Sequence, residues 1–327
     1  MIFRTEVNPD ISESKIDYNT SLFFIGSCFS DNIGGKVKSF KFNTVTNPFG
    51  VLYNPTSVRN ALEIIMAKDY FVESDLENHN GLWLSFYHHG SFSDVDKTIV
   101  LSKINKAIDE AHNRLKTAKF LFITFGTARV YERKGVGNVV ANCHKLPENN
   151  FTRRLLPVDS IVRDYNVFLQ QLKKFNPDIN VVFTVSPVRH WKDGAHGNQI
   201  SKSTLLLAIN NIVENNTDTS YFPSYEIVID DLRDYRFYKS DMLHPSDEAV
   251  EYIWERFQDS FITNQTKAVI SRAQKLTNAA LHRPFNPNTD QHQKFIKSAL
   301  QKIEIFEKEF PLANFDEEKK LLESFLV

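Results

Sequence analysis

The stretch 22–31 constrains the fold more than any other part of the sequence. It begins with four apolar residues typical of a buried strand, and a turn of small residues then leads into a helical pattern over 31–39. Gly26 permits a sharp bend, which brings Ser27 and Cys28 to the N-terminus of the predicted helix. Free N–H groups and the positive end of the helix dipole favour an anion there. The sequence therefore predicts a strand–turn–helix unit able to stabilise a thiolate or an oxyanion.

Strands and helices alternate along most of the chain. Strands are predicted near 22–25, 42–46, 119–125, 181–185 and 226–229. Strands joined by helices pair in parallel, so we expect an α/β fold: a three-layer α/β/α domain with a mostly parallel sheet. We place this domain at 1–262, with an aromatic-rich insertion at about 69–96 that forms a lip beside the site. A helical extension, 263–327, is a candidate homodimer surface.

Composition narrows the function classes. The 327 residues are 42% apolar and include 27 Phe, enough for a sizeable core. Because 39 basic residues face 40 acidic ones, no electrostatic argument for binding nucleic acid or an anionic membrane arises. No apolar run has the length of a membrane span or a signal peptide, so we expect a cytoplasmic protein. We expect no cofactor, and read Cys28 and Cys143 as free thiols.

A cysteine after a buried strand is usually a small core residue, so Cys28 alone says little. A second segment strengthens the catalytic interpretation, because Asp241 and His244 lie three residues apart just before a helical stretch. One turn of chain brings such a pair within reach of each other. The segment 186–191 adds polar groups after a further predicted strand. The carboxyl ends of parallel strands are where open α/β sheets bind ligands.

The segment 26–30, Gly-Ser-Cys-Phe-Ser, resembles the signature of the GSCFA family, with Ser30 in place of the final Ala. That family resembles the SGNH (GDSL-type) hydrolases. The resemblance extends to about Phe261 and includes 184–191 and 241–245. It implies a flavodoxin-like domain that hydrolyses or transfers acyl groups of esters or thioesters, with a small-molecule or acylated substrate.

Aligned on Gly26, the GDSL pattern places Cys28 at the nucleophile's position and Ser27 at the neighbouring position. The resemblance implies that His244 is the base and that Asp241 orients its imidazole. A thiolate is a strong nucleophile, and a helix N-terminus and a histidine are expected to lower the pKa of Cys28. Ser27 stays open as an alternative nucleophile.

The oxyanion donors are less well matched. SGNH enzymes take one donor from a glycine N–H, for which Gly50 is the best match and the pair 34–35 competes. Their third block is Gly-x-Asn-Asp, whereas 126–129 reads Gly-Thr-Ala-Arg, so the usual asparagine is missing. Asn142 or Thr127 is a possible substitute. A plain surface turn is the alternative interpretation for these loops.

Arg189 and His190 are predicted substrate-binding residues. The planar guanidinium of Arg189 suits a carboxylate or phosphate, although a structural salt bridge is equally compatible with it.

Two further hypotheses assign the protein to other functional classes. A binding module could have kept the fold and lost the chemistry, as the missing asparagine suggests. A metal site made of Cys28, Cys143, His144 and His190 ranks last, because the spacing matches no zinc motif. We therefore expect no bound metal.

Overall fold

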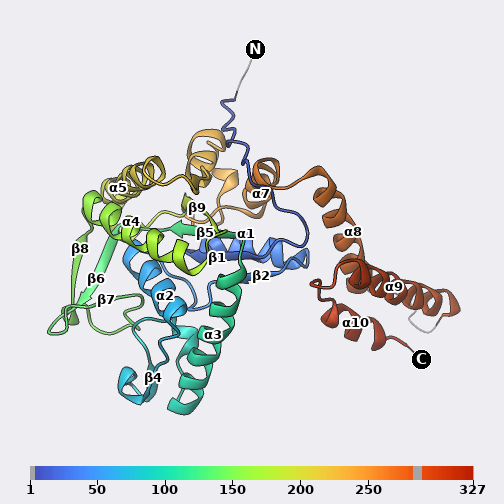
Figure 1. The fold of residues 1–327 in the computed structure, drawn as a ribbon, viewed down its shortest axis with the longest axis horizontal. Helices are drawn as coiled ribbons and strands as arrows, with labels where there is room; N and C mark the ends of the chain where they lie inside the picture. Colours follow the sequence, from blue (N-terminus) through green and yellow to red (C-terminus); the bar gives the residue numbers. More distant parts are fainter. Residues whose placement is uncertain (1–3, 283–288, 327) are drawn as a thin grey trace.

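The computed structural model describes residues 4–282 and 289–326. Its centre is a sheet of five strands in which every hydrogen-bonded pair is parallel (Figure 1). The strands are β1 (Leu22–Gly26), β2 (Thr44–Thr46), β5 (Phe120–Phe125), β9 (Asn180–Val185) and β10 (Thr219–Tyr221). Their order across the sheet, β10-β9-β5-β1-β2, is that of flavodoxin-like folds. The predicted α/β class is confirmed.

Helices cover both faces of this sheet, as the burial of β1 on both sides requires. Phe23 and Ile25 belong to a core under α2 (Pro55–Ala67), α3 (Lys97–Thr117), α4 (Val158–Phe175) and α5 (Gly194–Glu214). Leu22 and Phe24 belong to a second core under α1 (Cys28–Ser39) and α7 (Asp247–Phe261). Alternate residues of a strand point to opposite faces, so one apolar run fills two cores. This produces the expected three layers.

The strand predicted at 226–229 is wrong. This segment is helical, formed by α6 (Ser224–Glu226) and a π-helical turn over Ile227–Asp231. The last strand is instead β10, which pairs with β9. A short apolar run cannot distinguish a buried strand from a buried helical turn, and both Ile227 and Val228 are fully buried.

The insertion also differs from its prediction. It contains a hairpin, β3 (Glu77–His79) and β4 (Leu82–Leu84), and two 3₁₀ turns, Glu73–Asp75 and Gly90–Phe92. Trp83 and Tyr87 lie against the first core and His88 is fully buried beside the Phe49 ring, whereas Tyr70 is 49% exposed; none of these four rings lines the cavity described below. Of this insertion, His89 is the residue that reaches the cavity described below.

A second, antiparallel sheet was not predicted at all. It consists of β6 (Arg129–Arg133), β7 (Val139–Val140) and β8 (Phe151–Leu155), with β6 in the middle. Figure 1 shows it beside the main sheet, beyond the end of β5. Short 3₁₀ turns complete the irregular parts, at Glu148–Asn150, Trp191–Asp193 and Tyr235–Phe237.

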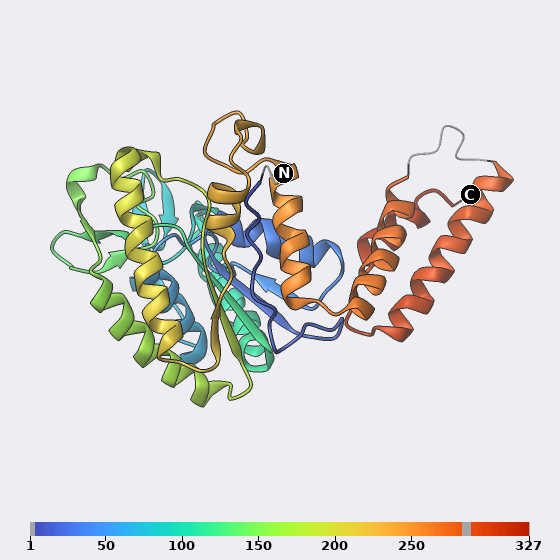
Figure 2. The same cartoon turned by 90° about the horizontal axis from the view of Figure 1, so that it is seen from above.

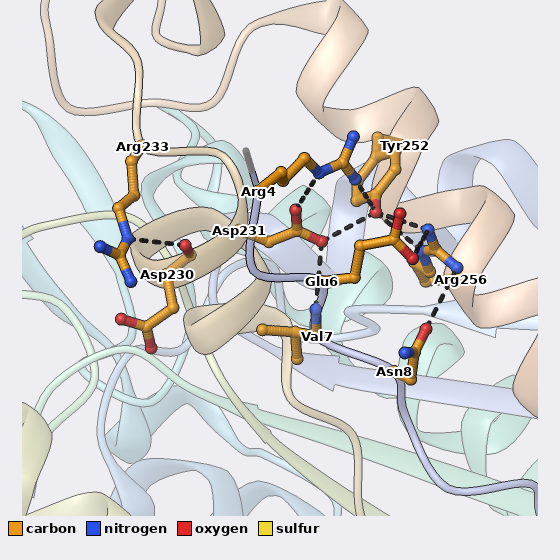
Figure 3. A network of polar contacts seen from close by, with 9 residues as sticks. All are labelled: Arg4, Glu6, Val7, Asn8, Asp230, Asp231, Arg233, Tyr252 and Arg256. Carbon is orange, nitrogen blue, oxygen red and sulfur yellow. Dashed lines mark hydrogen bonds and ion pairs between the residues drawn. The ribbon is translucent and has the colours of Figure 1, made fainter. Parts of the chain in front are cut away.

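The two ends of the chain are fixed differently. Near the start, Arg4 pairs with Asp231 and contacts Tyr252, whose hydroxyl donates to Asp231 at 2.8 Å (Figure 3). At the other end, α8 (Asn264–Leu281), α9 (Asp290–Glu309) and α10 (Asp316–Glu323) form a helical unit that projects from the main body (Figure 2). It touches the main domain through Tyr18, whose ring meets Phe306.

The helical character of the extension is confirmed, whereas a homodimer through it stays a prediction. Within residues 4–282 and 289–326, no helix combines the length and apolar character needed to cross a membrane.

Candidate active site

A cavity of about 560 Å³ opens at the carboxyl ends of β1, β5 and β9. Cys28, Thr127 and Ser186, which follow these three strands, all line it. Between β1 and β5 the strand order reverses, which is where flavodoxin-like folds bind their ligands. Seven of the predicted site residues line the cavity: Ser27, Cys28, Thr127, Asn142, Arg189, His190 and His244. Gly50 and Asp241 do not.

The turn before Cys28 requires glycine. Gly26 has φ +133°, and a Cβ there would lie 2.1 Å from the carbonyl oxygen of Thr124. The Gly26 N–H donates to Asn47 Oδ1 at 2.8 Å, and the Ser27 N–H donates to Thr124 O at 3.0 Å. The backbone leading to Cys28 is therefore fixed by two neighbouring parts of the sheet.

Cys28 and Ser27 differ in what their side chains already do. Ser27 is 1% exposed and caps α1, with its hydroxyl oxygen accepting the Phe29 N–H at 3.4 Å. Cys28 is the first residue of α1 and is partly exposed. Amides in the first turn of a helix have no intrahelical acceptor, so the Cys28 N–H is a candidate oxyanion donor.

The predicted lowering of the Cys28 pKa is wrong. Burial raises the pKa of the Cys28 thiol above its ordinary value, and the nearby Asp31 carboxylate raises it further. Lys202 and the amides of Cys28 and Phe29 act in the opposite direction but do not outweigh burial. Desolvation disfavours the charged thiolate more than the helix N-terminus favours it.

Asp241 and His244 are hydrogen-bonded to each other. Asp241 Oδ2 lies 2.6 Å from His244 Nδ1, while its Oδ1 accepts the N–H groups of Leu243 and His244 at 2.9 and 3.0 Å. These backbone donors and the imidazole lower the pKa of Asp241 to about 2, so it is ionised at neutral pH. With Nδ1 committed to Asp241, His244 keeps Nε2 for other partners, and its ring lines the cavity.

Gly50 cannot serve as the oxyanion donor in this conformation, which corrects the prediction. Its N–H already donates to Asn47 O at 2.8 Å. Its positive φ of 74° has a packing reason, because a Cβ there would lie 2.2 Å from His89 Cβ. The competing glycines 34 and 35 lie inside α1 and do not line the cavity either.

Asn142 is better placed than Thr127 to donate into the cavity. Asn142 Oδ1 accepts the His144 N–H at 2.8 Å, so the amide oxygen is occupied and the amide nitrogen is the group left to donate. The Thr127 hydroxyl accepts the Arg129 N–H at 3.1 Å and shares a second hydrogen bond of 3.0 Å with Ser201. Thr127 is thus largely occupied in holding the loop after β5.

His190 and Arg189 occupy the loop after β9. Burial lowers the pKa of His190 to about 4, so its ring is neutral at neutral pH. Among the described residues no carboxylate forms an ion pair with Arg189, and its buried Nε has no hydrogen-bond partner. Its hydrogen-bonded neighbour is the Tyr238 phenol. The structural salt bridge considered for Arg189 is therefore absent from the described part of the chain.

Sequence reasoning missed Lys202. This lysine is fully buried in α5, and its Nζ donates to Gly126 O and Ser186 O at 2.7 Å each. Burial lowers its pKa to about 7, and its charge favours the Cys28 thiolate. A signal was present, because the buried stripe of α5 through Leu205, Ala208, Ile209 and Ile212 extends back to Lys202 at helical spacing.

The second sheet supplies further unpredicted lining residues, namely Arg129 and Tyr131 from β6 and Arg153 from β8. The metal hypothesis gains no support from the geometry. His144 Nε2 is 2.9 Å from the Ser85 carbonyl oxygen and does not line the cavity. In the described parts of the chain, no group of three or more His, Cys, Asp or Glu side chains is arranged so that it could hold a metal ion.

Comparison with solved structures returned distant matches. One is a protein from Streptococcus pneumonia assigned provisionally as a platelet activating factor, at 10% identity and a TM-score of 0.38, covering 74% of this chain and 83% of that one. Another is an acetyl xylan esterase from the rumen bacterium Butyrivibrio proteoclasticus, at 12% identity and a TM-score of 0.37, covering 74% and 63%. A search of curated proteins found no match.

Two family models match the sequence. Residues 273–327 match the C-terminal domain of GSCFA domain proteins, and residues 21–257 match the GSCFA family. The second match spans most of the chain and contains Cys28, Asp241 and His244. The chain therefore belongs to the GSCFA family.

Proposed function

We propose that this protein cleaves an ester or thioester and passes the acyl group through Cys28 to water or another acceptor. One observation carries the proposal: Cys28, at the first position of α1, and His244, held by Asp241, line the same cavity at the sheet's switch point. A nucleophile, a base and an orienting carboxylate are the parts that covalent acyl transfer requires.

In the proposed reaction, His244 Nε2 takes the proton from Cys28 Sγ, and the sulfur attacks the acyl carbon. The tetrahedral intermediate collapses when His244 returns that proton to the leaving alcohol or thiol. An acyl thioester then remains on Cys28. Water or an acceptor hydroxyl, deprotonated by His244, then attacks this thioester; the carbon–sulfur bond breaks, the acyl group leaves on the acceptor, and His244 returns the proton to Cys28 Sγ. Asp241, ionised throughout, stabilises the imidazolium that forms in each half of the cycle.

The oxyanion is proposed to be stabilised by the Cys28 N–H and the Asn142 amide group. Both belong to cavity-lining residues, and the Asn142 amide oxygen is already held by the His144 N–H. The neutral imidazole of His190, which also lines the cavity, is proposed as a further donor. Preorganised donors of this kind contribute about 10²- to 10³-fold each in acyl-transfer enzymes.

The proposal is tested by exposing the purified protein to an activated acyl ester or a small thioester and measuring its intact mass. Peptide mapping then locates the adduct. We expect a single acyl group on Cys28, none in Cys28→Ala, and only partial weakening in Ser27→Ala. Cys143 also lines the cavity as a free thiol, so Cys143→Ala is the matched control and should acylate like the wild type.

An adduct lost in Ser27→Ala but kept in Cys28→Ala would move the nucleophile by one residue. An adduct lost only in Cys143→Ala would contradict the proposed triad.

A non-catalytic binding module on the same fold is the second candidate. The raised pKa of Cys28 favours it, because a thiol kept protonated is a weak nucleophile. The same acylation experiment separates the two. A binding module acylates at Cys28 no faster than a free thiol does, whereas an enzyme forms the Cys28 adduct faster and then loses it on turnover.

A further inference from the structure

The cavity that contains Cys28 and His244 is strongly cationic. Its lining includes four side chains that are positively charged at neutral pH, and none of the described lining residues is an aspartate or glutamate. The four are Arg129, Arg153, Arg189 and Lys192. They come from β6, β8 and the loop after β9, so they surround the cavity from more than one side.

Two carboxylates outside the lining compensate part of this charge. Asp193, whose side chain is 1% exposed, forms ion pairs with both Arg129 and Arg153. Lys192 pairs with Glu148, whose side chain is 78% exposed on the surface. Asp193 is thus shared by two arginines and Lys192 has its own partner, while the carboxylates of Asp31 and Asp241 lie beside Cys28 and His244.

Arg189 is the lining cation that has no ion-pair partner among the described residues. Its Nε is buried without a hydrogen-bond partner, and the phenol of Tyr238 contacts it in place of a carboxylate. Withdrawing a guanidinium from water without an anionic partner costs free energy. An anion that enters the cavity removes this cost, and the planar guanidinium can donate two parallel hydrogen bonds to it.

We infer that the substrate carries an anionic group, a carboxylate or a phosphate monoester, and that Arg189 and Arg153 bind it. The inference rests on the proposed function, which supplies the ester or thioester bond that is cleaved. The anionic group is inferred from the cationic side chains of the cavity. A cavity of about 560 Å³ has the size of a small-molecule site, so ester and anion belong to one compact ligand.

The test uses small thioesters that differ in charge. S-acetyl-N-acetylcysteamine is the neutral reference, and S-succinyl-N-acetylcysteamine carries a carboxylate on the acyl side. S-acetyl-3-mercaptopropionate and S-acetyl-2-mercaptoethyl phosphate carry a carboxylate or a phosphate on the leaving side. We expect kcat/KM for at least one anionic thioester to exceed that of the neutral one by about 10- to 100-fold, as charge-assisted hydrogen bonds imply. The thioester with the highest kcat/KM identifies which anion the site binds, and whether that anion belongs to the acyl side or the leaving side of the substrate.

Variants assign this preference to Arg189. Arg189→Gln should lower the ratio of anionic to neutral kcat/KM by about tenfold or more, and Arg189→Lys should restore part of it through charge alone. Arg163→Gln, on the exposed surface of α4, is the matched control and should leave the ratio unchanged. Thermal unfolding of each variant verifies folding.

A binding measurement separates this inference from the proposed function. Calorimetric titration with inorganic phosphate and with succinate needs no turnover, and binding that weakens in Arg189→Gln supports an anion site even if no thioester acylates Cys28. Acylation of Cys28 with equal kcat/KM for all four thioesters, and no phosphate or succinate binding, would overturn the inference and leave the proposed function intact. Absence of both acylation and anion binding would overturn both.

Discussion

The two halves of the candidate site are held in opposite ways. Cys28 follows a fully buried strand, and its turn is fixed by Asn47 and Thr124, residues distant in sequence. His244 lies on a surface loop with its side chain 45% exposed, and its side chain is held by Asp241, three residues away. One half is thus positioned by the core of the domain, and the other by local hydrogen bonds.

This difference predicts different mobility. Elements with few buried contacts open at a lower free energy than core strands do. We therefore expect the backbone at Cys28, the proposed nucleophile, to be preorganised, and the loop of His244, the proposed base, to be able to adjust when a ligand enters.

Removing either reacting group should abolish acyl-enzyme formation. We expect Cys28→Ala and His244→Ala each to reduce single-turnover acylation by at least about 10³-fold, and the double variant to lose no more than either one. Nucleophile and base act as a unit, so their losses do not add. Additive losses, or a His244→Ala variant at the wild-type rate, would show that a different base serves Cys28.

Changing the backbone should affect the two halves unequally. Gly26→Ala places a Cβ 2.1 Å from a buried carbonyl oxygen, and we expect it to lower the free energy of unfolding by about 3 kcal/mol or more. Met242 in the His244 loop also has positive φ, 57°, but is 52% exposed. Met242→Gly should therefore change stability by less than about 1 kcal/mol. Urea denaturation of both variants measures the contrast, and equal effects would contradict it.

Weakening the support of the base should cost less than removing the base. Asp241→Asn keeps an oxygen to accept the Leu243 and His244 N–H groups but removes the charge beside the imidazole. We expect acylation to fall by about 10²-fold or more, yet less than for His244→Ala: the base remains, but the amide NH₂ that replaces the carboxylate oxygen donates to Nδ1 and favours the tautomer with its proton on Nε2. Single-turnover kinetics with one thioester ranks the two, and a loss as large as that of His244→Ala would contradict a merely supporting role of Asp241.

The pH dependence should report the burial of Cys28. Its pKa is raised, so the reactive thiolate increases with pH up to and beyond the ordinary thiol range. Asp31→Asn removes one charge that raises this pKa, so the rise in acylation rate should move to lower pH. The exposed Asp178→Asn is the control, expected to leave the profile in place. A shift to higher pH in Asp31→Asn would contradict the charge assignment.

The same contrast explains what the sequence could predict. The strand–turn–helix around Gly26 and the Asp241–His244 pair are local patterns, and both lie where expected relative to the sheet. Whether the Gly50 N–H is free to donate to a ligand depends on one turn hydrogen bond, to Asn47 O, which residue type alone does not reveal. The raised pKa of Cys28 depends on burial by segments distant in sequence.

The antiparallel sheet is unpredictable for a related reason. Arg129 and Arg153 reach the cavity only because β6 and β8 pair with each other, a contact between distant residues. The segment 226–229 shows the converse: its apolar run indicates a strand, whereas tertiary packing makes it helical.

The buried amine of Lys202 links folding to the release of a proton. Its pKa is about 7 in the folded protein, against an ordinary value of 10.5. Between these two pH values the unfolded chain binds a proton that the folded chain releases, so this group makes folding more favourable as pH rises. The slope is at most about 1.4 kcal/mol per pH unit. Ionisation of the Cys28 thiol also increases with pH, but its raised pKa contributes to folding with the opposite sign, because the unfolded chain loses the thiol proton at lower pH than the folded chain does.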